Sequence, residues 1–175
     1  MVLRRLLFLV LAPLVLVLSC GEPGARAQPS LIGKADLVLV FKGERRMELR
    51  RDGRAIRSYR ISLGASPRGH KVQEGDERTP EGLYSLDWRN PKSSYYKSLH
   101  VSYPNEQDRE HAFRLGVDPG GMIMVHGLPN WYRPGLADWL FLGRDWTDGC
   151  IAVTNDEMEE IWHAVDDGTP IMIYR

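Results

Sequence analysis

Two residues of the sequence, Cys150 and His126, could together perform nucleophilic catalysis. Cys150 follows Gly149 directly and precedes an apolar run within residues 145–153 (DWTDGCIAV). A cysteine thiolate needs a neighbouring base to take up or balance its proton, and a preceding glycine lets a backbone N–H approach the reacting centre. His126 ends the apolar run 122–125, where a strand end can present an imidazole to a cleft. The pair indicates acyl-transfer chemistry; the alternative is a lone buried cysteine that packs as a small apolar residue.

The other residues that commonly do chemistry form weaker patterns. We expect His100, His111 and His163 to be ordinary histidines, and the sequence has no metal-ligand spacing, nucleotide-binding glycine loop or G-x-S-x-G motif. Lysine and arginine together number 23, as do aspartate and glutamate, so the net charge is zero. A basic surface for nucleic acid is therefore not expected. The sequence predicts no metal, no cofactor and no nucleic-acid partner.

Residues 1–20 have the organisation of a signal peptide. Two arginines precede a charge-free apolar run, residues 6–18, which is shorter than the roughly 20 residues that cross a membrane. Two processing sites are open. A lipobox ends at Cys20, which would be lipidated and would anchor the protein to a membrane, and a small-x-small pattern ends at Ala27. Either site predicts an exported protein of the periplasm or cell envelope.

Export changes what the second cysteine means, because the sequence contains only two. If Cys20 is lipidated or removed, Cys150 has no partner for an intramolecular disulfide. An unpaired thiol in an oxidising compartment needs a functional reason. The leader therefore strengthens the interpretation of Cys150 as a nucleophile.

The remaining chain is predicted to be a short tether, residues 21–35, followed by one domain over residues 36–175. Short runs rich in β-branched and aromatic residues, separated by turn residues, predict strands. These runs cover residues 36–42, 47–51, 55–63, 82–87, 98–103, 122–126 and 170–174. The pair Asp52-Gly53 predicts a hairpin turn. The long loop 64–81 is of a length that is usually functional or disordered.

One helix is predicted, and it begins shortly after Cys150. Thr154 and Glu157 form a capping box, and apolar residues then recur with helical spacing as far as Gly168. These apolar residues are Met158, Ile161, Trp162 and Val165. Many strands with one clear C-terminal helix indicate a mainly β domain.

The motifs around His126 and Cys150 resemble those of the bacterial L,D-transpeptidase catalytic domain, the YkuD family. That family carries a histidine followed by glycine or serine, and further on a Ser/Thr-His-Gly-Cys motif followed by an apolar residue. Here the corresponding segments are His126-Gly127 and residues 147–151 (TDGCI), and residues 79–82 (TPEG) resemble the family's TPxG segment. The resemblance runs from about residue 37 to residue 175. It implies a sandwich-like domain of mixed sheets with few helices.

The resemblance also implies roles for individual residues. Cys150 would be the nucleophile and His126 the general base, oriented by the backbone carbonyl of Gly127. The N–H groups of Gly149 and Cys150 would form the oxyanion hole, and Thr147 would support the motif. The substrate would be a peptidoglycan stem peptide, which forms a thioester with Cys150 that the amine of a second stem resolves. Neither a cofactor nor an oligomer is expected.

Two departures from the family pattern leave the reaction open. Asp148 stands where the family usually has histidine, and Ala152 where it usually has arginine or asparagine. This pattern is typical of a divergent, YafK-like branch. One alternative is a hydrolase of the same fold, either an L,D-carboxypeptidase or an amidase that cleaves a lipoprotein–peptidoglycan link. Another is a lipid-anchored, non-catalytic module that binds peptidoglycan.

Six further residues are expected to contact substrate. They are Arg68, His70 and Arg78 in the long loop, and Tyr103, Trp131 and Trp146 among the aromatic residues near the motifs. The charged residues would bind substrate carboxylates, and the aromatic residues would line a peptide groove; the alternatives are a solvated loop and ordinary packing. Residues 139–142 (WLFL), between the two motifs, are predicted either to form a lid or to pack against the domain.

Overall fold

The structure is a computed structural model that describes residues 32–135 and 137–175. The predicted signal peptide, both processing sites and Cys20 lie outside the described residues, as does most of the predicted tether. Within the described part of the chain, no helix has the length and apolar character needed to span a membrane.

Eight strands form one mixed sheet in the order β3-β2-β1-β8-β4-β5-β6-β7. The strands are β1 (Leu37–Phe41), β2 (Arg46–Arg51), β3 (Arg54–Arg60), β4 (Gly82–Asn90), β5 (Ser98–Val101), β6 (Met124–His126), β7 (Ile151–Ala152) and β8 (Thr169–Tyr174). β1 is parallel to β8 and β6 is parallel to β7, whereas all other neighbours are antiparallel. Each predicted run contains a strand. The β2–β3 hairpin turns at Asp52 and Gly53, whose φ angles of 50° and 73° fit a two-residue turn.

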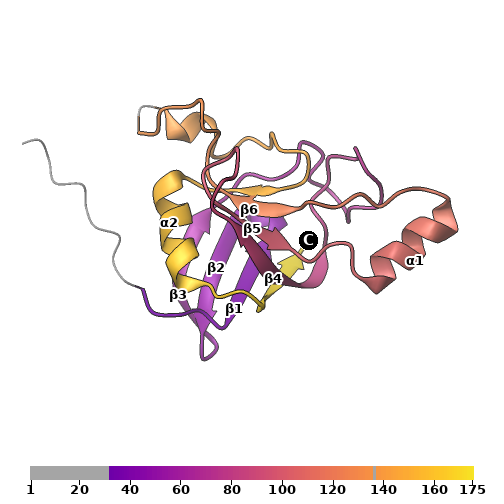
Figure 1. The fold of residues 1–175 in the computed structure, drawn as a ribbon, viewed down its shortest axis with the longest axis horizontal. Coiled ribbons are helices and arrows are strands. Elements are labelled where there is room, and N and C mark those ends of the chain that lie inside the picture. The colour runs from indigo at the N-terminus through magenta and orange to yellow at the C-terminus, as the bar shows by residue number, and fades with distance from the viewer. Residues whose placement is uncertain (1–31, 136) are drawn as a thin grey trace, which may run out of the picture.

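The sheet curls so that segments next to its two edges meet. Figure 1 shows β1, β2 and β3 running in a different direction from β6 at the other end of the sheet. Beyond β3, Ser62 exchanges two backbone hydrogen bonds of 2.9 Å with Ala152 of β7, and Gly64 bridges Thr147. The curl produces the mainly β, sandwich-like domain that the sequence predicts. It also brings the segment that carries Cys150 against the segment that follows β3.

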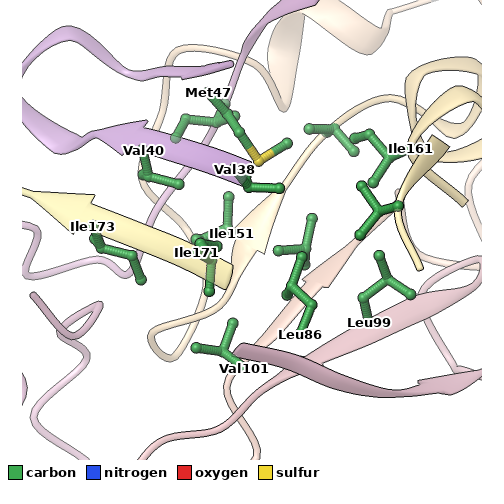
Figure 2. Packing of buried hydrophobic residues seen from close by; sticks show 14 of the residues in the cluster. Val38, Val40, Met47, Leu86, Leu99, Val101, Ile151, Ile161, Ile171 and Ile173 are labelled. Atoms are coloured by element: carbon green, nitrogen blue, oxygen red, sulfur yellow. The ribbon is translucent and has the colours of Figure 1, made fainter. Parts of the chain in front are cut away.

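The core lies inside the curl, where side chains from both halves of the sheet meet (Figure 2). In β1 the buried positions alternate with half-buried ones, as expected for a strand with one face on the core. The side chains that meet there are each at most 2% exposed, and they include Val38, Val40, Leu86, Leu99, Val101, Ile151, Ile161, Ile171 and Ile173. The core therefore joins strands from both ends of the chain, since β8 lies between β1 and β4.

The predicted C-terminal helix is α2 (Asn155–Ala164), and its capping box is present. The Thr154 hydroxyl oxygen accepts the Glu157 N–H at 3.2 Å, and the Glu157 carboxylate accepts the Thr154 N–H at 2.9 Å. The helix lies beside β3 (Figure 1), where the Tyr59 hydroxyl donates to Glu160 at 3.2 Å. Two short 3-10 helices are also present, η1 (Lys42–Glu44) and η2 (Asp138–Leu140).

A second helix, α1 (Glu106–Leu115), is not predicted from the sequence pattern. It projects from the body of the domain (Figure 1), and Phe113 and Leu115 on it are 85% and 55% exposed. A helix that buries so little apolar surface shows no apolar periodicity. The available signal was its ends, because Asn105 and Asp108 form a capping box and Gly116 adopts the left-handed conformation that ends a helix.

The long loop 64–81 is held to the domain by charged groups. The Asp76 carboxylate accepts three backbone N–H groups of the loop and pairs with the buried Lys71 at 2.9 Å. Lys42 is only 2% exposed, and its ammonium donates to two carbonyl groups of the loop and to Glu81. These contacts give the loop a defined path past the segment that carries Cys150.

The two faces of β4 provide a matched test of this packing. Leu86 is 1% exposed and lies in the core, whereas Leu83 in the same strand is 58% exposed. We expect Leu86→Ala to lower the free energy of unfolding by about 2–5 kcal/mol, because it leaves a cavity. We expect Leu83→Ala to change it by less than about 0.5 kcal/mol. Urea unfolding measures both, and equal losses would contradict this description of the core.

Candidate active site

Cys150 and His126 line one cavity of about 200 Å³ beside β6 and β7. Sequence spacing alone does not bring them together; the parallel pairing of β6 with β7 does. His126 is the last residue of β6 and pairs with Ala152, while Cys150 immediately precedes β7. The cavity is lined by Ser93, Tyr95, Ser98, Met122, Met124, His126, Trp146, Thr147, Asp148 and Cys150.

The His126 imidazole is oriented by the next residue. Its Nδ1 lies 2.6 Å from the carbonyl oxygen of Gly127. A carbonyl oxygen can only accept, so Nδ1 carries the hydrogen and a neutral ring keeps its Nε2 lone pair free. His126 is 4% exposed, and burial lowers its pKa to about 4. At neutral pH the ring is therefore uncharged and able to accept a proton.

Gly127 cannot carry a side chain in this structure. A Cβ at this position would lie 2.6 Å from the Asn155 side-chain oxygen and 2.9 Å from the Cβ of Tyr96. The Asn155 oxygen also accepts the Leu128 N–H at 2.8 Å. Helix α2 thus packs directly against the turn that orients the imidazole.

The Cys150 thiol is half-buried and makes two long contacts with the segment before and in β6. Its sulfur accepts the Met124 N–H at 3.4 Å and donates to the Met122 carbonyl oxygen at 3.6 Å. Burial raises the pKa of the Cys150 thiol, and the Asp148 carboxylate raises it further; the Met124 N–H and Lys71 act in the opposite direction. The resting site therefore holds a neutral thiol beside a neutral imidazole, not an ion pair.

Thr147 organises the loop that carries the thiol. Its hydroxyl donates to the Cys150 carbonyl oxygen at 2.7 Å and accepts the Gly149 N–H at 3.2 Å. The Gly149 N–H, expected in the oxyanion hole, thus points at Thr147 in this structure. Gly149 has a φ of +126°, and a Cβ there would lie 2.6 Å from the Arg78 carbonyl oxygen. The TDGC segment therefore requires a glycine at this position.

The start of the same loop is fastened to the segment after β3. The Leu63 carbonyl accepts the N–H groups of Trp146 and Thr147 at 3.1 and 3.2 Å, and the Leu63 N–H donates to Asp145 at 3.2 Å. Arg45 donates to the two oxygens of the same carboxylate, from Nε at 2.9 Å and from Nη2 at 2.6 Å. Bidentate arginine–carboxylate pairs fix geometry as well as charge. Five hydrogen bonds therefore set where the loop that carries Cys150 begins.

Of the six predicted substrate contacts, the structure places Trp146 in the cavity. Its ring centroid lies 5.9 Å from that of His126. The arginine Arg68 lines a different cavity, beside Lys42 and Arg175. Trp131 is 79% exposed and packs on Tyr132 and Phe141.

The other three predicted contacts meet one another away from the cavity. Tyr103 is 2% exposed, and its hydroxyl donates to the Pro119 carbonyl oxygen at 3.1 Å. The His70 ring packs edge-on against Tyr103, and its Nε2 lies 3.0 Å from Asp108. The Arg78 side chain reaches back to the His70 carbonyl oxygen, whereas its own carbonyl faces the TDGC loop. In this structure these residues support the long loop.

The WLFL segment is packed at one end and exposed at the other. The Phe141 ring lies 5.7 Å from Trp146, and its carbonyl oxygen accepts the Trp146 ring N–H at 3.1 Å. Trp139 is 71% exposed.

Tyr95 and Ser98 also line the cavity. Tyr95 is one of the aromatic residues near the motifs that could wall a groove, whereas sequence reasoning did not single out Ser98. Ser98 pairs with His126 across β5 and β6, and the ring centroids of Tyr95 and His126 are 4.7 Å apart. No motif marks either residue. Their positions follow from the strand register and from the path of the β4–β5 turn.

Comparison with known proteins identifies the family. The family model described as the L,D-transpeptidase catalytic domain, YkuD, matches residues 35–173. YafK of Escherichia coli (strain K12), whose assignment as an L,D-transpeptidase is itself provisional, is 31% identical over 142 residues, which cover 77% of this chain and 49% of YafK.

Solved structures show the same fold. The helical cell shape determining protein Pgp2 from Campylobacter jejuni is similar with a TM-score of 0.62 and 29% identity, over 79% of this chain and 47% of Pgp2. An L,D-transpeptidase from Xylanimonas cellulosilytica shares the fold with a TM-score of 0.53 and 17% identity, over 86% of this chain and 65% of its own. The chain spans about half the length of YafK and Pgp2. By sequence and by fold, it belongs to the YkuD family of L,D-transpeptidase catalytic domains.

Proposed function

We propose that this protein is an exported, cysteine-dependent acyltransferase that acts on peptidoglycan stem peptides. The observation that carries the proposal is that a thiol and an imidazole whose Nδ1 is held by Gly127 line one cavity of a YkuD-family domain. Export rests on the leader in residues 1–20, and we propose lipid attachment at Cys20 over cleavage after Ala27. Peptidoglycan is the substrate because it is what this family acts on.

Acylation would begin with proton transfer inside the neutral pair. His126 Nε2 takes the Cys150 proton as the sulfur attacks the carbonyl carbon of the third stem residue. The tetrahedral oxyanion needs backbone N–H donors, each of which contributes roughly 3 kcal/mol in comparable sites. Because the Gly149 N–H already donates to Thr147, we assign the Cys150 N–H as the hydrogen-bond donor to the oxyanion. Collapse then breaks the peptide bond, and the departing D-alanine amine takes the proton from His126.

Release of the thioester follows the same steps in reverse. An acceptor amine of a second stem gives its proton to His126 Nε2, attacks the thioester and forms a new peptide bond, while the sulfur recovers the proton. Water in place of the amine would give hydrolysis. The two outcomes share every residue of the first step, so the acceptor decides the net reaction.

Asp148 favours an amine acceptor. It lies at the exposed rim of the cavity that holds Cys150. A carboxylate beside the thioester attracts a protonated amine, which releases one proton to solvent before it attacks as the neutral amine, and it repels a substrate carboxylate. The departure from the family histidine thus adds a negative charge on the side from which the acceptor would arrive.

Intact-protein mass spectrometry with a carbapenem tests the proposed function. A carbapenem is a strained acyl donor, so we expect a covalent adduct on the protein and none on Cys150→Ala. Gly149→Ala is a second test, because its side chain would collide with the Arg78 carbonyl, and we expect slower acylation. Absence of any adduct on the unaltered protein would leave two alternatives, a specialised hydrolase that does not accept the drug and a non-catalytic binding module.

Asp148→Asn tests the role of the rim carboxylate. Exposed ion pairs contribute little, so we expect the ratio of cross-linked to hydrolysed product to fall by roughly two- to fivefold. The same ratio should fall with added salt for the unaltered protein. Muropeptide analysis measures the products, and Asp156→Asn, an exposed aspartate on α2, is the control. A ratio unchanged in Asp148→Asn would remove this residue from acceptor selection.

The buried base predicts the pH dependence of stability. Because the folded-state pKa of His126 is lowered to about 4, the unfolded chain binds this proton more readily between pH 6.5 and pH 4. Stability therefore falls as the pH falls through this window, and His126 accounts for a loss of roughly 2 kcal/mol between pH 7 and pH 5. We expect this part of the loss to disappear in His126→Gln, as measured by urea unfolding at both pH values. Equal pH dependence in the two proteins would contradict a buried, neutral His126.

A further inference from the structure

The aromatic ring that covers His126 comes from the turn between β4 and β5. The Tyr95 ring centroid lies 4.7 Å from the centroid of His126 and 6.0 Å from that of Trp146. Tyr95 is 40% exposed, whereas His126 is 4% exposed. Tyr95 therefore lies between the imidazole and solvent. We expect the position of the Tyr95 ring to control the access of water to the His126 ring.

The turn that carries Tyr95 has an unfavourable backbone. The next two residues, Tyr96 and Lys97, have φ angles of 28° and 24°. Residues other than glycine in this region cost about 1–3 kcal/mol each and keep such angles only where the surroundings impose them. The turn must therefore be held from outside, and the structure shows holding contacts on two sides.

Asn130 holds the turn from the segment that follows His126. Its side-chain oxygen accepts the Tyr96 N–H at 2.9 Å, and its side-chain nitrogen donates to the Ser93 carbonyl oxygen at 2.8 Å. Its backbone N–H donates to the Ser94 carbonyl oxygen at 3.0 Å. Three hydrogen bonds thus tie the turn to the strand end that presents the base.

Glu159 holds the turn from α2. Its carboxylate accepts the Tyr96 hydroxyl at 2.8 Å and pairs with the Lys97 ammonium at 2.6 Å. The same ammonium lies 5.2 Å from the centre of the Trp162 ring. Helix α2, which also packs against Gly127, therefore fixes Tyr96 and Lys97, the two residues of the turn with positive φ angles.

We propose that Asn130 and Glu159 are positioning residues for the base, because they keep the Tyr95 ring on His126 and exclude solvent from the imidazole. The proposal rests on the proposed role of His126. Burial, and not a neighbouring charge, lowers the pKa of His126. The titratable groups that the structure places around the base and the turn include Tyr95, Tyr96, Cys150, Asp148, Lys97, Glu159 and His163.

The direct test is an NMR titration of the His126 ring, which needs no activity. We expect Tyr95→Ala to raise the titration midpoint by about one to two pH units, because the ring becomes hydrated. Asn130→Ala and Glu159→Gln should raise it by smaller amounts. Tyr95→Phe keeps the ring and should keep the midpoint. Asn90→Ala is the matched control, since it removes one hydrogen bond, to the Lys92 N–H, at the other end of the same loop.

Two results would overturn the proposal. An unchanged midpoint in Tyr95→Ala would mean that Tyr95 does not keep the base dry. A shift in Tyr95→Ala with none in either Asn130→Ala or Glu159→Gln would mean that these two residues do not position the ring. Glu159→Gln keeps the size of the side chain, so the test does not depend on Asn130→Ala folding.

The rate of carbapenem acylation provides a second readout. If the midpoint in Tyr95→Ala rises by one to two units, the rate at pH 5 relative to pH 7.5 should fall by roughly two- to tenfold, because less of the base is neutral. No such fall should occur in Asn90→Ala. A protein that forms no adduct at any pH would contradict the proposed function, and the NMR titration would still decide the positioning role.

Discussion

The backbone of Leu63 is the point on which the site depends, because it holds the loop that carries Cys150. Its carbonyl and N–H groups form hydrogen bonds with the first residues of that loop. Arg45 binds the Asp145 carboxylate, which also accepts the Leu63 N–H. Close packing allows nothing bulkier there: a Cβ on Gly64 would lie 2.0 Å from the Glu77 carbonyl oxygen and 3.0 Å from the Cα of Gly149. The curl of the sheet, which joins the region after β3 to β7, therefore also positions the loop that carries Cys150.

Burial then decides the protonation state of the pair. The imidazole and the thiol both lose hydration inside the curl, which lowers the pKa of His126 and raises that of Cys150. In the proposed mechanism a neutral pair moves its proton during attack, which needs a free Nε2 and a held Nδ1, as Gly127 holds it. Exclusion of water from His126 is then part of the proposed chemistry, and we propose that the turn that carries Tyr95 contributes to it.

Much of this fold and part of this site could be predicted from the sequence. Strands such as β1 follow from runs rich in β-branched and aromatic residues, and α2 follows from its capping box and apolar spacing. The helix α1 could not be recognised by periodicity, because it buries only a small part of its surface. Of the aromatic residues, Trp146 reaches the cavity, whereas Tyr103 packs on the core side beside Tyr84. Residue type alone does not distinguish these positions; strand register and the paths of the loops do.

The most direct test of the central claim is trapping of the acyl-enzyme with the natural substrate class. The protein is mixed with a tetrapeptide stem, quenched in acid within seconds, and examined by intact-protein and peptide mass spectrometry. We predict a tripeptide acyl group on Cys150, released D-alanine in proportion to it, and neither in Cys150→Ala. A protein that releases no D-alanine and carries no acyl group, while still binding the peptide, would contradict acyl transfer at Cys150.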